Sequence, residues 1–149
     1  MLSLVSILAA GSLASADIRS ILLQQGFPGP LNGRETIEYV GRIQENPNIY
    51  QIYLYRGSSK AAAVNHGINW LIVVKNGRAY SGGYRIPMPS RCKVERLKVI
   101  CNAGIFKFTR NGPPKQIVFD GEELNFSAGR HSFTSRSISS ACPRLGASG

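Results

Sequence analysis

Only a few side chains in this sequence are suited to acid–base chemistry. His66 stands in an Asn-His-Gly loop just before a predicted strand, where an imidazole can act as a general acid or base near neutral pH. Arg91 supplies a cation for an anionic substrate, and Glu38 or another carboxylate supplies a base. The second histidine, His131, falls in the C-terminal tail. This set is compatible with general acid–base catalysis on an anionic substrate.

Other catalytic patterns are absent from the sequence. A serine triad of the hydrolase type needs a G-x-S-x-G turn, which is missing, and Asp17 and Asp120 are the only aspartates. No C-x-x-C, H-x-H or H-E-x-x-H spacing supports a metal site, and no glycine-rich phosphate loop opens a helix. The sequence therefore predicts neither a metal nor a cofactor.

Positive charge is concentrated in one part of the chain. The sequence has 18 Lys and Arg against 8 Asp and Glu, for a formal charge of +10. Seven of the basic residues share a stretch in which Glu95 is the only acid: Arg85, Arg91, Lys93, Arg96, Lys98, Lys107 and Arg110. Such a local positive field favours a polyanion, for example RNA, as the partner. The alternative is that the charge only keeps the protein soluble.

Aromatic residues on predicted strands extend the RNA hypothesis. Trp70, Tyr80 and Tyr84 lie on strands near the basic stretch, where their rings are candidates for stacking on bases while Lys and Arg neutralise phosphates. Aromatic residues on strands more often fill a core. Their exposure therefore decides between the two roles.

The three cysteines leave two pairings open. In the near-symmetric run from Cys92 to Cys101, a turn at Glu95–Lys98 places the two cysteines opposite each other on paired strands, within disulfide range. If the run is instead one continuous strand, Cys142 pairs with either of them. We prefer the Cys92–Cys101 disulfide.

The N-terminal residues predict export. Residues 1–16 carry no charged side chain and end in Ala14-Ser15-Ala16, the pattern of a secretory signal peptide cleaved before Asp17. This run is shorter than the roughly 20 apolar residues that span a bilayer, so no transmembrane segment is predicted. We expect a secreted protein, extracellular or, in a bacterium, periplasmic.

Apolar alternation and turn signals predict a mainly β or α+β fold. After a short helix over Ile18–Gln25, N-capped by Asp17, we expect an antiparallel meander sheet of about seven to nine short strands. Asn76-Gly77 is its strongest hairpin signal. The chain divides into the signal peptide, a single domain over residues 17–126 and a tail over 127–149 that is flexible unless Cys142 anchors it.

The stretch from Trp70 to Arg91, with its Tyr80-Ser81-Gly82-Gly83 segment, followed by the strand beginning Gly104-Ile105, resembles the secreted fungal guanyl-specific ribonuclease family. The resemblance covers about 40 residues and implies a helix packed on an antiparallel sheet. It places the family's catalytic base on Asn69 and its acid histidine on Phe108, neither of which can do that chemistry. Arg91 alone matches a charged catalytic position. The resemblance thus implies a catalytically degenerate, effector-like member.

Three hypotheses for the function follow. The first is a small secreted basic protein that binds RNA or another polyanion without catalysis, in the manner of a fungal effector directed at a host. The second is a divergent secreted endoribonuclease that uses His66 and Arg91, with Glu38 or another carboxylate as the base. The third is a structural or protein-interaction module of the cell envelope, in which the charge only keeps the protein soluble. A host protein is the alternative partner to a polyanion. The sequence does not indicate an oligomeric state.

Overall fold

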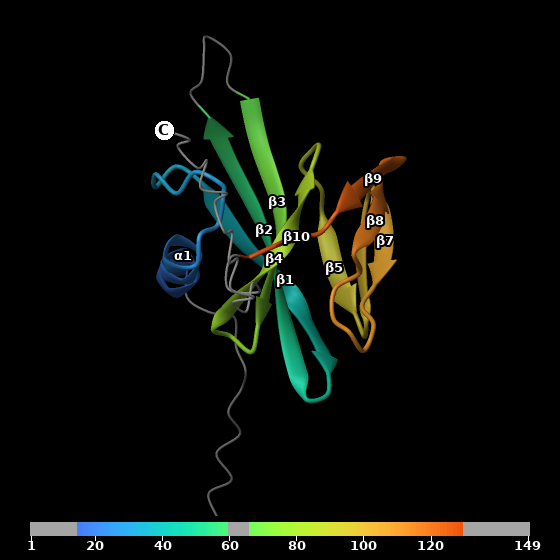
Figure 1. Cartoon of the computed structure of the whole chain (residues 1–149). Helices are drawn as coiled ribbons and strands as arrows, with labels where there is room; N and C mark the ends of the chain where they lie inside the picture. The colour runs from blue at the N-terminus through green and yellow to red at the C-terminus, as the bar shows by residue number, and fades with distance from the viewer. Residues whose placement is uncertain (1–14, 60–65, 130–149) are drawn as a thin grey trace, which may run out of the picture.

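Ten antiparallel strands and one helix make up the described part of the protein. The structure is a computed structural model that describes residues 15–59 and 66–129 (Figure 1). The elements are α1 (Ser15–Gln24), β1 (Thr36–Glu45), β2 (Asn48–Ser59), β3 (His66–Lys75), β4 (Ala79–Ile86), β5 (Cys92–Glu95), β6 (Lys98–Cys101), β7 (Gly104–Lys107), β8 (Gln116–Phe119), β9 (Glu122–Asn125) and β10 (Ser127–Ala128). The predicted class, mainly β with one short N-terminal helix, is confirmed.

The four long strands form most of one sheet, in the order β1-β2-β3-β4-β10. The hairpin between β3 and β4 turns at Asn76 and Gly77, which have φ of 53° and 69°. Both angles are positive, as a type I′ turn requires, and Asn-Gly tolerates them best. This predicted hairpin is therefore confirmed.

The meander does not continue as one sheet. After β4 the chain passes through Pro87 and Pro89, which have no backbone N–H to donate to a ladder. The next strands form two small sheets, β5-β6-β7 and β8-β9. The strands number ten rather than seven to nine, because β10 returns to pair Ser127 with Gly83 of β4. The ordered sheet thus extends into the segment that the sequence assigned to a tail.

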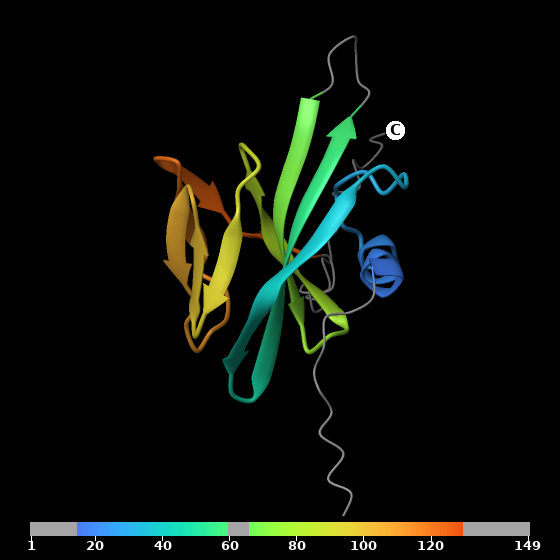
Figure 2. The same cartoon turned by 180° about the vertical axis from the view of Figure 1, so that it is seen from behind.

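Each face of the long sheet is covered, by α1 on one side and by the small sheets on the other (Figure 2). Ile18 and Leu22 of α1 are buried against one face, together with residues of β2 and β3. The small sheets bury Val99, Phe106 and Phe119 against the opposite face. The helix begins at Ser15 and not at Ile18, so Asp17 lies in its first turn and is not the N-cap that the sequence predicted.

Two register shifts decide which side chains reach which core. The first lies between Tyr39 and Gly41 on β1, and it turns Gly41 toward the small sheets, where a Cβ would lie 2.8 Å from Val94 Cβ. The second, opposite Val73 and Val74, inserts Ser81 into β4. A one-residue insertion reverses the alternation of a strand. Strand β5 can therefore pack closely against β1 at a glycine.

The described residues contain no helix long and apolar enough to cross a lipid bilayer.

Candidate functional site

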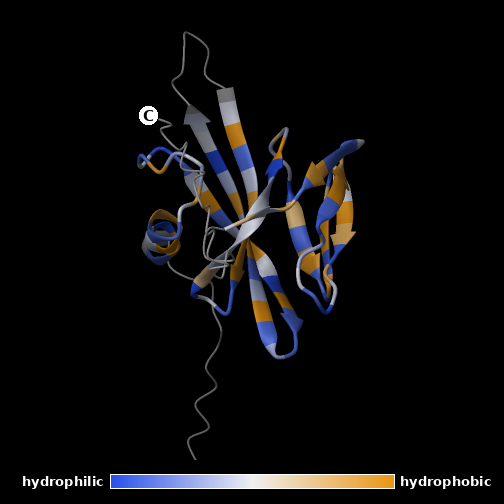
Figure 3. Ribbon diagram, viewed as in Figure 1, coloured by the Kyte–Doolittle hydropathy of each residue, from blue (hydrophilic) through white to orange (hydrophobic). Residues whose placement is uncertain are grey.

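The outward side of the small sheet β5-β6-β7 carries most of the clustered positive charge. Hydrophilic and hydrophobic residues alternate along its strands (Figure 3). Val99 and Phe106 are buried in the core, while Lys98 and Lys107 are exposed. The exposed cations on these strands and their flanking loops are named here the basic face: Arg91, Lys93, Arg96, Lys98, Lys107 and Arg110. The structure thus gathers six of the seven residues that the sequence singled out.

Like charges oppose each other on this face. Lys98 of β6 lies directly across from Lys107 of β7, an arrangement that destabilises an isolated sheet. On the other side Lys98 faces Glu95, which also forms an ion pair with Lys93 (Nζ to Oε1, 2.7 Å). The hydrogen bond and charge of Lys93, followed by the charge of Lys98, lower the pKa of Glu95. One carboxylate is thus the only acid among six cations.

A disulfide fixes the base of this sheet. Cys92 and Cys101 oppose each other on β5 and β6, with Cα atoms 4.0 Å apart and a sulfur–sulfur bond between them. The turn at Arg96, with φ of 54°, gives the predicted register, in which Glu95 faces Lys98. The preferred pairing is therefore confirmed, while Cys142 lies outside the described residues.

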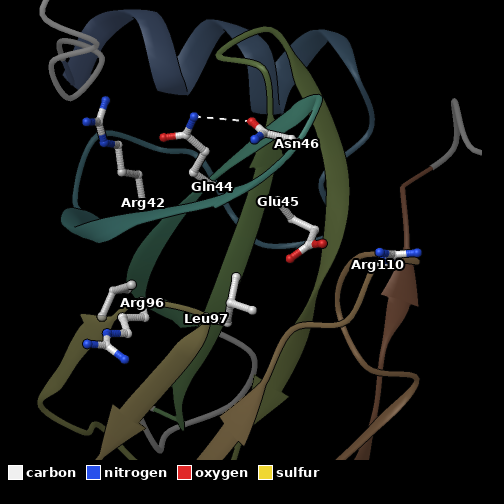
Figure 4. A pocket seen from close by; sticks show the side chains of 8 residues that line it. Arg42, Gln44, Glu45, Asn46, Arg96, Leu97 and Arg110 are labelled. Carbon is white, nitrogen blue, oxygen red and sulfur yellow. Dashed lines mark hydrogen bonds between the residues drawn. The ribbon is translucent and has the colours of Figure 1, made fainter.

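An open groove of about 780 Å³ runs between the edge strand β1 and the β5–β6 turn (Figure 4). Its lining residues are Arg42, Gln44, Glu45, Asn46, Val94, Arg96, Leu97 and Arg110. In Figure 4, Arg42 and Gln44 extend on one side of the β1 ribbon, while Arg96 and Leu97 lie on the other. The Gln44 Nε2 donates to Asn46 Oδ1 at 3.3 Å. The groove lining therefore includes three arginines from distant parts of the sequence, of which Arg42 extends on the side of β1 away from Arg96.

A second groove, of about 610 Å³, continues past the same turn. It shares Arg96 and Leu97 with the first and adds Lys98 and Lys107 to the lining. Within residues 15–59 and 66–129, neither Arg96 nor Arg110 makes an ion pair or a side-chain hydrogen bond. Their guanidinium groups are therefore available to an anion. Arg42, with the same freedom, was not predicted, because the groove forms only by the packing of β5 against β1.

The proposed stacking residues are not available. Trp70 is 7% exposed and Tyr80 is 2% exposed, both in the core beneath α1, and Tyr84 is fully buried against the small sheets. Burial raises the pKa of Tyr80 to about 12, and the Tyr84 hydroxyl donates to the carbonyl of Pro114. Their assignment as binding residues is therefore wrong, because these rings are buried in the cores on the two faces of the long sheet.

Arg85 also lies apart from the basic face. It is exposed on β4 and pairs with Trp70 of β3, whose ring belongs to the core beneath α1. Residues directly opposed on paired strands share a face of the sheet. Arg85 is thus on the α1 side of the long sheet, and its assignment to the same binding surface is wrong.

The residues of the ribonuclease hypothesis are spread over separate elements. His66 begins β3, where its backbone pairs with Ser59. Arg91 precedes β5, next to Ser90, whose carbonyl accepts a hydrogen bond from Arg56 Nη2 at 3.5 Å. Arg56 lies three strand positions from Ser59, which is roughly 10 Å along β2. Glu38 is exposed on edge strand β1, and His131 is outside the described residues.

The positions that the ribonuclease resemblance assigns to acid–base chemistry are closed to solvent. Asn69 is 6% exposed on β3, and Phe108 is fully buried against the long sheet. Among the described residues, no group of three His, Cys, Asp or Glu side chains could hold a metal ion. The accessible chemistry of this surface is therefore that of its cations.

Comparison with known proteins assigns no family to this chain. No protein-family model, no curated protein and no solved structure matches it. The resemblance to the fungal ribonucleases accordingly depends on the quoted residues alone.

Proposed function

We propose that this chain is a non-enzymatic binding protein that captures a polyanion on its basic face. The observation that carries the proposal is the gathering of six exposed cations around a single acid on one small sheet. Opposed Lys98 and Lys107 repel each other in the free protein, and an anion placed between them would relieve that repulsion. The arrangement stabilises a complex more than it stabilises the fold.

The physical basis of capture is charge attraction and counterion release. The sheet is about 13 Å long by strand rise and about 10 Å wide, so it can meet a few phosphates of a chain at once. With Trp70, Tyr80 and Tyr84 buried, RNA would be held by its backbone and not by base stacking. Binding of RNA is then expected to be insensitive to base sequence.

Export belongs to the same proposal. The apolar residues 1–16 have the pattern of a signal peptide, and a disulfide within the basic sheet suits an oxidising compartment. The cleavage point expected before Asp17 falls inside α1, two residues after its start, and leaves Ile18 and Leu22 in place. A role as a secreted effector rests on the resemblance to the fungal ribonucleases.

The test is a titration of labelled single-stranded RNA with the protein at several salt concentrations. Each neutralised phosphate contributes about −0.7 to the slope of log K against log salt, so three to six contacts predict a slope of about −2 to −4. Lys98→Gln with Lys107→Gln should reduce both the affinity and the slope. The matched control, Arg34→Gln with Arg78→Gln, removes equal charge from exposed positions outside the basic face.

Two outcomes contradict the proposal. Binding that does not depend on salt, or that the control pair weakens as much as the lysine pair, would remove the basic face from the mechanism. Cleavage of the RNA that is lost in His66→Ala would favour the ribonuclease hypothesis instead.

A further inference from the structure

Apolar side chains share the outward side of the small sheet with the lysines. Ile100 of β6 and Ile105 of β7 oppose each other in the same cross-strand row as Lys93, next to the row that holds Lys98 and Lys107. Ile105 is 64% exposed. On β8, which packs beside β7, Val118 also points outward and is 56% exposed, while its neighbours Ile117 and Phe119 are buried.

These residues are not explained by the fold. The inward positions of the same strands already fill the core with Val99, Phe106 and Phe119. Four large apolar side chains are strongly exposed in the described part of the chain, and two of them, Ile105 on β7 and Val118 on β8, belong to the small sheets. Exposed aliphatic groups beside lysines mark a surface whose partner is both anionic and partly apolar.

We infer that the polyanion captured by the basic face is the surface of a bilayer that contains anionic lipid. This inference rests on the proposed function and names its partner. Lysine ammonium groups meet the lipid phosphates and carboxylates, while Ile105 and Val118 enter the boundary between headgroups and acyl chains. A lysine stem can bend toward the headgroups while its aliphatic part stays in apolar contact.

Nucleic acid fits the same surface less well. A single strand of RNA presents bases that gain most from aromatic rings, and the candidate rings Trp70, Tyr80 and Tyr84 are buried. The accessible apolar groups are aliphatic instead, which suits lipid and not base stacking. The surface is a disulfide-linked sheet, whose backbone needs little reordering to meet a partner.

Acidic residues mark one limit of the proposed contact. Glu123 lies opposite Val118 on β9, and Glu122 precedes it on the same exposed strand. An anionic surface would repel both carboxylates. The contact is therefore expected to centre on Ile105 and the three lysines, with Val118 near its border.

The experiment is sedimentation with vesicles of phosphatidylcholine alone or with about 30 mol% phosphatidylserine. A chain beginning at Asp17 is run beside the full chain, so that the contribution of the apolar residues 1–16 is measured. We expect binding to the anionic vesicles that falls as salt is raised, and little binding to phosphatidylcholine alone. Lys98→Gln with Lys107→Gln should weaken it about 25-fold, from about fivefold for each lysine.

The apolar contribution to vesicle binding is tested with single substitutions at two apolar residues of nearly equal exposure. Ile105→Ser should weaken vesicle binding about tenfold without changing the melting temperature, because the side chain is mostly in solvent. The matched control is Leu23→Ser on α1, 63% exposed on the opposite side of the long sheet, which should leave binding unchanged.

The remaining results would contradict the lipid inference, the proposed function or both. Salt-dependent binding of RNA without binding to anionic vesicles would overturn the lipid inference and leave the proposed function standing. Binding of neither would overturn both. An effect of Leu23→Ser as large as that of Ile105→Ser would show that the basic face does not contact the bilayer.

Discussion

At the scale of single residues, a few side chains hold the loop before β1 in place. The Glu35 carboxylate is only 1% exposed and accepts hydrogen bonds from the backbone N–H groups of Asn32 and Gly33 at 3.0 and 2.8 Å. Its other oxygen lies 2.7 Å from Arg19 Nε on α1. Burial by itself raises the pKa of Glu35, but the backbone hydrogen bonds and the charge of Arg19 outweigh it, so the net pKa is lowered.

This lowered pKa gives a prediction about acid stability. A carboxylate with a lowered folded-state pKa contributes stability that is fully present above its unfolded-state pKa and is lost as pH falls through the folded-state pKa. Melting curves between pH 6 and pH 2 should therefore show a loss of stability at acid pH that is smaller in Glu35→Gln. At pH 6 that variant should be less stable by about 1 to 2 kcal/mol. Identical pH dependence in the two proteins would contradict this prediction.

At the scale of elements, the β5–β6 hairpin depends on its disulfide. Each strand has only four residues, and an isolated hairpin of this length is marginal in water. The Cys92–Cys101 bond closes a short loop of the unfolded chain and so reduces its entropy. The buried side chain of Val99 and the contact of Val94 with β1 supply the remaining support.

We expect Cys92→Ser with Cys101→Ser to lower the free energy of unfolding by about 2 to 3 kcal/mol, measured by denaturant titration. The control is Cys142→Ser, which leaves the pair intact and should have no effect. Should Cys142→Ser destabilise the protein as much as the double substitution, the third cysteine would be part of the covalent structure. Unchanged stability in the double variant would show that packing alone holds the hairpin.

At the scale of the whole molecule, one core joins the long sheet to both small sheets. Phe108, just after β7, is fully buried there. The centroid of its ring lies 5.3 Å from that of Tyr50 on β2 and 6.4 Å from that of Phe106. Its backbone N–H donates to the Leu97 carbonyl in the β5–β6 turn at 2.8 Å. The position that the ribonuclease resemblance gives to a catalytic histidine is thus a central packing position in this protein.

Phe108→Ala should lower the free energy of unfolding by about 3 to 5 kcal/mol, because it leaves a cavity among three sheets. Since the sheets share this core, the loss should appear in one cooperative transition followed by both circular dichroism and tryptophan fluorescence. The control is Ile105→Ala, a substitution of an exposed residue three positions earlier in the chain. It should change the free energy of unfolding by less than about 0.5 kcal/mol. Two separate transitions would instead show that the small sheets unfold independently.

Local features of this protein follow from neighbouring residues and were predictable. The Asn76-Gly77 turn, the facing of Cys92 and Cys101, and the exposure of Lys93, Lys98 and Lys107 depend on turn chemistry and strand alternation. They need no knowledge of distant segments. The sequence therefore sufficed for the fold class and most of the basic face, and it favoured the Cys92–Cys101 pairing over those with Cys142.

Other features depend on contacts between segments far apart in the chain. Insertion of Ser81 turns Tyr80 and Tyr84 to opposite cores, and burial on both sides of the long sheet removes the rings that were expected to stack on bases. Packing of β5 against β1 at Gly41 forms the groove that Arg96 and Arg110 line, while Arg42, the next residue, extends from the other side of β1. Alternation shows that a strand has two faces, but not which face meets solvent, because that depends on what packs against it.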